Sequence, residues 1–185
     1  MTKPIYKYPG FVKKVELEKT DKKRFWLELV IDESKDENIV VILKNPSRAN
    51  KEVSDKTVYN VSNYIYRNIE KYEVFSNVKS IIILNLIPHY QTYSNKLEVL
   101  KNEVICKDNL DTIKRITSQH SKTIIAWGNH PSGLYQEYEI LKEQVMQIFT
   151  DNNNLVFFVD KFSKAENPKH AMVWGYCDTL KEFIT

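Results

Sequence analysis

Four short, unbroken apolar runs separated by helical patterns limit the folds open to this chain more than any other feature. They cover residues 39–43, 81–84, 123–127 and 155–159 and are rich in isoleucine and valine. A strand buried on both faces has such a continuous apolar pattern. Because strands that alternate with helices pair in parallel, the sequence predicts an α/β fold: a doubly wound, four-stranded parallel sheet with helices on both faces.

Apolar residues three and four apart predict helices between these strands. In residues 56–72 the pattern is formed by Val58, Val61, Ile65 and Ile69. Further helices are expected over residues 101–118, 134–149 and 178–183. Alternating residues over 11–31, with a polar turn in the middle, predict an N-terminal β-hairpin. We therefore expect a single domain over residues 1–185, with the hairpin as an extension of a core over residues 39–176.

Composition excludes several classes of protein. The chain has 185 residues, a net charge of +3 and two cysteines, which are too few for a disulfide framework or a four-thiolate metal site. It has neither a signal peptide nor an apolar run of membrane-spanning length, so a cytoplasmic protein without membrane contact is expected. The four histidines lack paired carboxylates, and no glycine-rich phosphate loop occurs. We expect no metal and no cofactor.

Polar residues follow the apolar runs, at the sheet edge where open α/β proteins bind ligands. They are Asn45-Pro46-Ser47, Asn85, the segment 127–132, and His170 after the last run. Two amides and a histidine suit the hydrogen-bonding edge of a nucleobase better than they suit acyl or phosphoryl transfer. The alternative is that Asn85 only caps a turn.

The order of these motifs resembles that of the uracil-DNA glycosylase superfamily. It is more closely similar to an uncharacterised bacterial family with an N-P-S motif, the domain-of-unknown-function family 1643. The matching segments lie within residues 39–176 and are Asn45-Pro46, Leu84-Asn85-Leu86, Ala126–His130 and, in part, Lys169–Val173. In the last segment Ala171-Met172 stands where the superfamily has Pro-Ser.

The resemblance implies a DNA repair hydrolase that flips a uracil out of DNA and hydrolyses its N-glycosidic bond slowly. It implies two catalytic residues, Asn45 to hold the water and His170 to stabilise the departing base. Asn85, Tyr59, Pro46 and Ser47 would bind the substrate. Lys44, Arg48, Lys169 and Met172 would contact single- or double-stranded DNA. An aspartate at position 45 is expected to keep or raise activity, since a carboxylate can act as a base.

Other functions stay open. The same fold with little or no catalysis would be a binding module for nucleic acid or for a partner protein. Asn45 and the altered last motif favour that alternative. Hydrolysis or binding of a free nucleotide would need phosphate ligands that the motifs do not supply. His130 also precedes Pro-Ser, but we prefer His170 because His130 lies in the segment that follows the third run.

Overall fold

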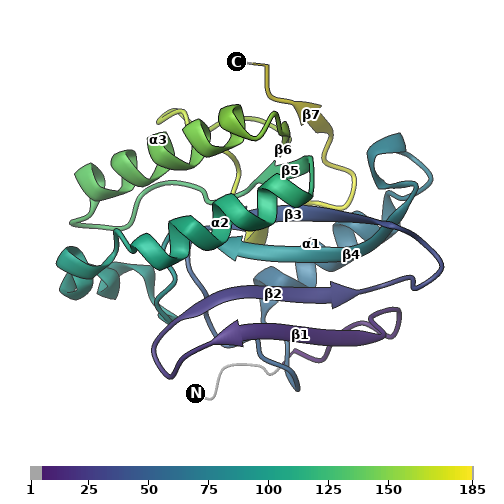
Figure 1. Ribbon diagram of the computed structural model, residues 1–185, viewed down its shortest axis with the longest axis horizontal. Coiled ribbons are helices and arrows are strands. Elements are labelled where there is room, and N and C mark those ends of the chain that lie inside the picture. Colours follow the sequence, from purple (N-terminus) through teal and green to yellow (C-terminus); the bar gives the residue numbers. More distant parts are fainter. Residues whose placement is uncertain (1–5, 185) are drawn as a thin grey trace.

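The computed structural model describes residues 6–184 and contains a seven-stranded mixed sheet between layers of helices (Figure 1). The strand order across the sheet is β1-β2-β4-β3-β5-β6-β7. The strands are β1 (Lys14–Lys19), β2 (Arg24–Val30), β3 (Glu37–Leu43), β4 (Val78–Asn85), β5 (Lys122–Ile125), β6 (Leu155–Val159) and β7 (Leu180–Glu182).

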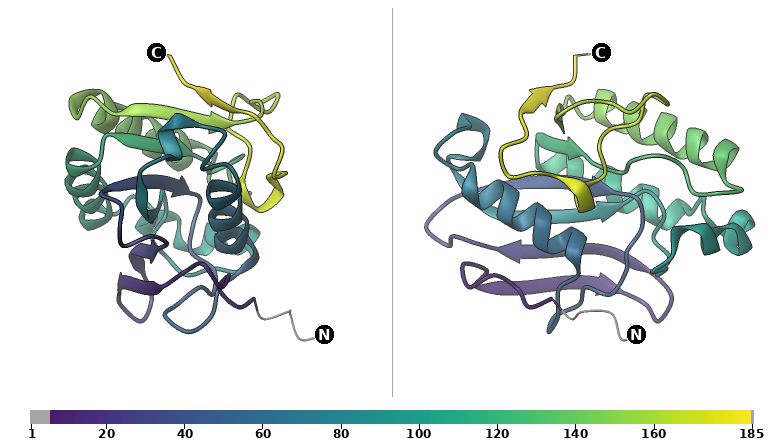
Figure 2. Two further views of the ribbon diagram at one scale, coloured as in Figure 1. Left: turned by 90° about the vertical axis from the view of Figure 1, so that its right-hand side faces the viewer. Right: turned by 180° about the vertical axis from the view of Figure 1, so that it is seen from behind.

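Helices cover both faces of the sheet (Figure 2). The α-helices are α1 (Lys56–Arg67), α2 (Lys107–Gln119) and α3 (Tyr135–Asp151), and the 3-10 segments are η1 (Glu73–Phe75), η2 (Ser94–Glu103) and η3 (Ala171–Val173). Helix α1 lies on one face, whereas α2 and α3 lie on the other and pack against each other. Within residues 6–184, no helix has the length and hydrophobicity needed to cross a membrane.

The unbroken apolar run of β4 is explained by two separate hydrophobic cores. Ile81 and Ile83 belong to the core beneath α1, and Ile82 and Leu84 belong to the core beneath α2 and α3. Successive residues of a strand point to opposite faces, so a strand covered on both sides needs apolar side chains at every position. Strand β3 follows the same rule, with Val41 in the first core.

The central strands β4, β3, β5 and β6 are mutually parallel, so their carboxyl ends lie at one edge of the sheet. From β3 the chain passes through α1 to β4 on one side, then through α2 to β5 on the other side of β3. The helices that follow β3 and β4 therefore leave on opposite faces. This reversal creates a crevice beyond the end of β3, where open α/β sheets bind ligands.

The predicted α/β class and the helices on both faces are confirmed, but the sheet is mixed and seven-stranded, because antiparallel pairs flank the four parallel strands. The hairpin expected over residues 11–31 forms β1 and β2, and β2 joins β4 antiparallel. The helix expected over 178–183 is wrong. Those residues include β7, which pairs antiparallel with the otherwise open edge of β6 and buries Leu180. The helix expected over 101–118 begins only at Lys107, because η2 precedes it.

We expect Tyr138→Phe to lower the stability of the protein, because Tyr138 supports the loop that follows β5. Tyr138 is fully buried on α3, and its hydroxyl lies 3.1 Å from the carbonyl oxygens of both Trp127 and Gly128. Loss of this donor leaves buried carbonyls unpaired and should cost about 1–2 kcal/mol. A calorimetric scan should show a midpoint lower by roughly 2–8 °C. Tyr135→Phe, at an exposed position of the same helix, should shift it by less than about 1 °C. Equal midpoints for both variants would contradict this role.

Candidate functional site

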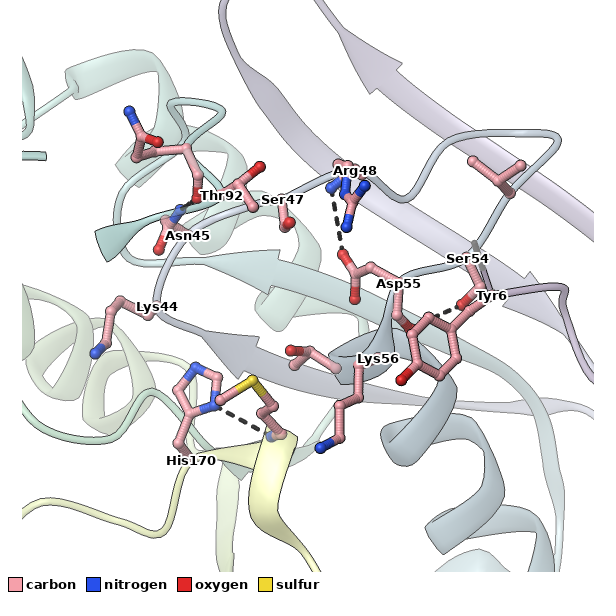
Figure 3. Close-up of a pocket in the computed structure, with 14 residues that line it drawn as sticks. Tyr6, Lys44, Asn45, Ser47, Arg48, Ser54, Asp55, Lys56, Thr92 and His170 are labelled. Carbon is pink, nitrogen blue, oxygen red and sulfur yellow. Dashed lines mark hydrogen bonds between the residues drawn. The ribbon is translucent and has the colours of Figure 1, made fainter. Parts of the chain in front are cut away.

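A pocket of about 610 Å3 lies beyond the carboxyl end of β3 (Figure 3). Its lining comes from the loop after β3, the start of α1, the loop after β4, the region of η3, and the N-terminal segment. The lining residues are Tyr6, Lys44, Asn45, Ser47, Arg48, Val53, Ser54, Asp55, Lys56, Thr57, Gln91, Thr92, His170 and Met172. The pocket thus occupies the crevice that the strand order creates.

The side chain of Asn45 is held in one orientation by the loops around it. Its Nδ2 donates to the carbonyl oxygen of Gln91 at 2.7 Å and to that of Pro46 at 3.0 Å. The backbone N–H of Gln91 also donates to the Pro46 carbonyl, which joins the two loops. Both amide hydrogens are used, so Oδ1 is left as an acceptor. It is directed toward the side of the pocket where Lys44 and His170 lie (Figure 3).

His170 is positioned by close packing against Gly128. Gly128 has a φ of +67°, and a Cβ atom there would lie 2.8 Å from the Cβ of His170. The Nδ1 atom of His170 accepts a hydrogen bond from the backbone N–H of Met172 at 3.1 Å. The proton of the neutral ring is therefore on Nε2, which is directed toward Lys44 and Asn45 (Figure 3).

Burial keeps this imidazole uncharged. It lowers the pKa of His170 to about 4, and the charge of Lys44 adds to the effect. Since the group loses its proton well below neutral pH, His170 offers the pocket a neutral N–H donor at pH 7. Such a donor can stabilise an anion that develops in front of it.

The pocket carries more positive than negative charge. Lys44, Arg48 and Lys56 line it, and Asp55 is its carboxylate. Asp55 is engaged as the N-cap of α1, where Oδ1 accepts from the Val58 N–H at 2.9 Å. Its Oδ2 accepts from two backbone N–H groups of residues 48 and 49, each at 3.4 Å. The pocket is therefore suited to an anionic ligand.

Asn85 lies behind the pocket and does not line it. Its side chain is fully buried, and neither amide atom has a hydrogen-bond partner among the described residues. Asn85 pairs with Leu43 in the sheet, and alternation along β4 places its side chain on the α1 face. Asn85 is not among the residues that line the pocket.

The structure also leaves other predicted residues out of the pocket lining. Tyr59 packs on Tyr6, with ring centroids 5.7 Å apart, and Pro46 is buried. Lys169 forms ion pairs with Asp160 at 2.9 Å and Asp178 at 2.7 Å, so its charge is already neutralised. In contrast, six predicted residues line the pocket together: Lys44, Asn45, Ser47, Arg48, His170 and Met172.

Sequence reasoning missed several lining residues. Asp55 precedes an amphipathic helix, which is the usual pattern of an N-cap, and that signal could have placed the helix start at the site. Gln91 and Thr92 lie in the loop after β4, where the strand-end rule also applies. Tyr6 carries no such signal. The preference for His170 over His130 agrees with their placement, since His130 is exposed and packs on Tyr135.

No metal centre is found in this region. Within residues 6–184, no group of three or more histidine, cysteine, aspartate or glutamate side chains could hold a metal ion.

Comparisons with known proteins give a family match. The model of a family described as "Protein of unknown function (DUF1643)" matches residues 24–172. No curated protein and no solved structure matches the chain. None of these comparisons relates the chain to uracil-DNA glycosylases.

We expect the His170 imidazole to titrate near pH 4 in a proton NMR titration, since burial lowers its pKa to about this value. In the unfolded chain it should titrate near 6.5, so the unfolded state binds the proton first as pH falls. The stability contributed by neutral His170 is thus complete above pH 6.5 and is lost as pH falls toward 4. Relative to His170→Gln, which removes this titration alone, the loss should be about 3 kcal/mol. Titration near 6.5 in the folded protein would contradict the buried neutral ring.

We expect Asn85→Leu to raise the free energy of unfolding by about 1 kcal/mol, because it removes an amide that is buried without partners. Asn109 provides the matched control. It is equally buried, but its Nδ2 donates to the carbonyl oxygens of Asn85 and Leu86 at 2.9 and 3.1 Å. Asn109→Leu should therefore destabilise the protein. Urea denaturation of the two variants measures the difference, and equal losses of stability would contradict the assignment of Asn85 as unpaired.

Proposed function

We propose that this chain, which belongs to the DUF1643 family, hydrolyses the N-glycosidic bond of a uracil flipped out of DNA. The family's description names no activity, so the proposal is argued from the residues of the pocket. One observation supports this proposal above all others. A fixed amide acceptor, Asn45 Oδ1, and a neutral donor, His170 Nε2, are directed into the same pocket.

The chemistry needs a group for each of the two charges that form. Breaking the bond gives a cationic sugar and an anionic base. His170 would donate to an oxygen of the departing base as its negative charge grows. Asn45 would accept a hydrogen bond from a water molecule and orient it toward the sugar. Asp55 is occupied at the start of α1, so no carboxylate is assigned to deprotonate the water, and slow turnover is expected.

Binding of DNA is supported by the charge and size of the pocket. Arg48 and Lys56 would contact phosphates, and a volume of about 610 Å3 lies within the range of small-molecule sites. Tyr6 lines the pocket and could stack on a flipped base, with Tyr59 packed behind it. Met172 is 44% exposed at the same pocket and offers apolar contact.

The enclosed position of Asn85 favours the second candidate, a module that binds nucleic acid or a partner protein without turnover. Asn85 is fully buried and does not line the pocket, so the structure around it would have to open before it could pair with the base edge. The unpaired amide gives that movement a driving force, because a base would supply the missing partners. If Asn85 has this role, Asn85→Leu should bind DNA without preferring uracil.

The direct test is release of uracil from single- and double-stranded oligonucleotides. The protein should be purified from a host that lacks its own uracil-DNA glycosylase, since a trace of that enzyme would mimic slow turnover. We expect uracil release by the wild type. His170→Ala should lower the rate on the order of 100-fold, because it removes the donor to the departing base, with DNA affinity nearly unchanged.

Asn45→Asp is a second test. The sequence led us to expect equal or higher activity for this variant, whereas the hydrogen bonds of Asn45 lead us to expect lower activity. A carboxylate oxygen in place of Nδ2 would face the carbonyl oxygens of Gln91 and Pro46 at hydrogen-bonding distance. The repulsion should turn the side chain away and lower activity.

Absence of uracil release by the wild type would overturn the proposed glycosylase activity. Affinity for DNA that falls steeply with salt would then support the nucleic-acid module, and affinity that does not change with salt would support a protein partner.

A further inference from the structure

We propose that Lys44 is a nucleophile that forms an imine with the C1′ aldehyde of an abasic deoxyribose, which gives this pocket strand-cleaving lyase activity. The proposal deepens the proposed function, since it concerns the sugar that remains after the base has left. It adds a covalent step for which neither Asn45 nor His170 is suited.

Lys44 lies at a well-fixed point of the fold. It directly follows β3, the strand with a parallel neighbour on each side, and its carbonyl oxygen accepts from the Ile87 N–H at 2.9 Å. The side chain is half-buried and lines the pocket with Asn45 and His170. In Figure 3 these three residues lie on one side of the pocket, whereas Arg48 and Asp55 lie on the other. The proposal therefore places the Lys44 amine in the same pocket as the proposed water.

The surroundings of Lys44 favour the neutral amine that nucleophilic attack requires. Among the described residues, no ion pair includes Lys44, so no carboxylate oxygen lies within 4.0 Å of its Nζ. Burial lowers the pKa of Lys44. A lysine desolvated in this way is activated for attack on a carbonyl group.

Lys169 provides the contrast on the same edge of the sheet. It is held by Asp160 and Asp178, which raise its pKa although its partial burial opposes this. Lys169 is thus a charge that fixes the loop before η3, and its amine stays protonated. Of these two lysines, Lys44 lines the pocket and has no carboxylate partner, whereas Lys169 has two and does not line it.

The proposed reaction needs no oxidant, reductant or cofactor. The Nζ lone pair of Lys44 attacks C1′ of the open-chain sugar, and loss of one water gives the imine. A proton then leaves C2′ to water, the C2′–C3′ double bond forms, and the C3′–O bond breaks with its electrons on the departing 5′-phosphate strand. One water hydrolyses the imine, which releases the unsaturated aldehyde and restores the amine.

The test uses oligonucleotides with an abasic site prepared beforehand, so it does not depend on uracil release by this protein. Borohydride reduces the imine to a stable secondary amine, which links protein and DNA covalently. We expect a cross-linked band with the wild type, and peptide mass spectrometry should locate the adduct at Lys44. Lys44→Arg keeps the charge without a nucleophilic amine and should reduce cross-linking by at least about tenfold. Lys114→Arg, an exposed position on α2, is the matched control and should cross-link like the wild type.

The results separate this proposal from the proposed function. Uracil release without a borohydride adduct would overturn the lyase alone. An adduct on abasic DNA without uracil release would support the lyase and overturn the glycosylase. An adduct located at another amine, or one that Lys44→Arg leaves unchanged, would assign Lys44 to phosphate binding only. Because the adduct is mapped in the wild type, poor folding of a variant does not affect the conclusion.

Discussion

Burial of β3 and β4 on both faces is the constraint on which the rest of the structure depends. Because these strands need helices on each side, the chain must pass α1 over one face and α2 over the other. The crossing from β4 back to β5 then leaves the end of β3 between two diverging connections. Lys44 and Asn45 follow β3 directly, so the pocket is a consequence of how the hydrophobic cores are covered.

A single carboxylate connects this framework to the shape of the pocket. Asp55 caps α1 and accepts backbone N–H groups from residues 48 and 49, so it fixes the helix start and the loop after β3 together. The carbonyl oxygen of Ala49 in turn accepts from Nη1 of Arg24, a fully buried guanidinium, at 3.1 Å. The charge of Asp55 also favours the charged form of Arg24, which burial disfavours. The pocket wall is thus held by groups that are themselves expensive to bury.

The sequence predicted what depends on periodicity and missed what depends on packing between distant segments. The apolar runs located the four central strands, and the strand-end rule brought Asn45 and Ser47 to the site. The short last strand was missed because Leu180 and its neighbours have no pattern of their own, and they pair only because β6 offers a free edge. Sequence position also could not distinguish Asn85 from Asn45. Both follow apolar runs, but only Asn45 lines the pocket, and this difference depends on tertiary structure.

The polar groups around the pocket differ in how fully they are satisfied, and this difference bears on function. Asp55 and Lys169, which support the fold around the pocket, both have partners. Asn85 is buried without a partner, Lys44 has a pKa lowered by partial burial, and His170 avoids the cost of charge by remaining neutral. An unpaired buried polar group lowers stability by about 1–3 kcal/mol, and a ligand that pairs with it would recover this cost. Under the proposed function, these three side chains, an amine, an amide and an imidazole, are the groups that would engage a base and its sugar.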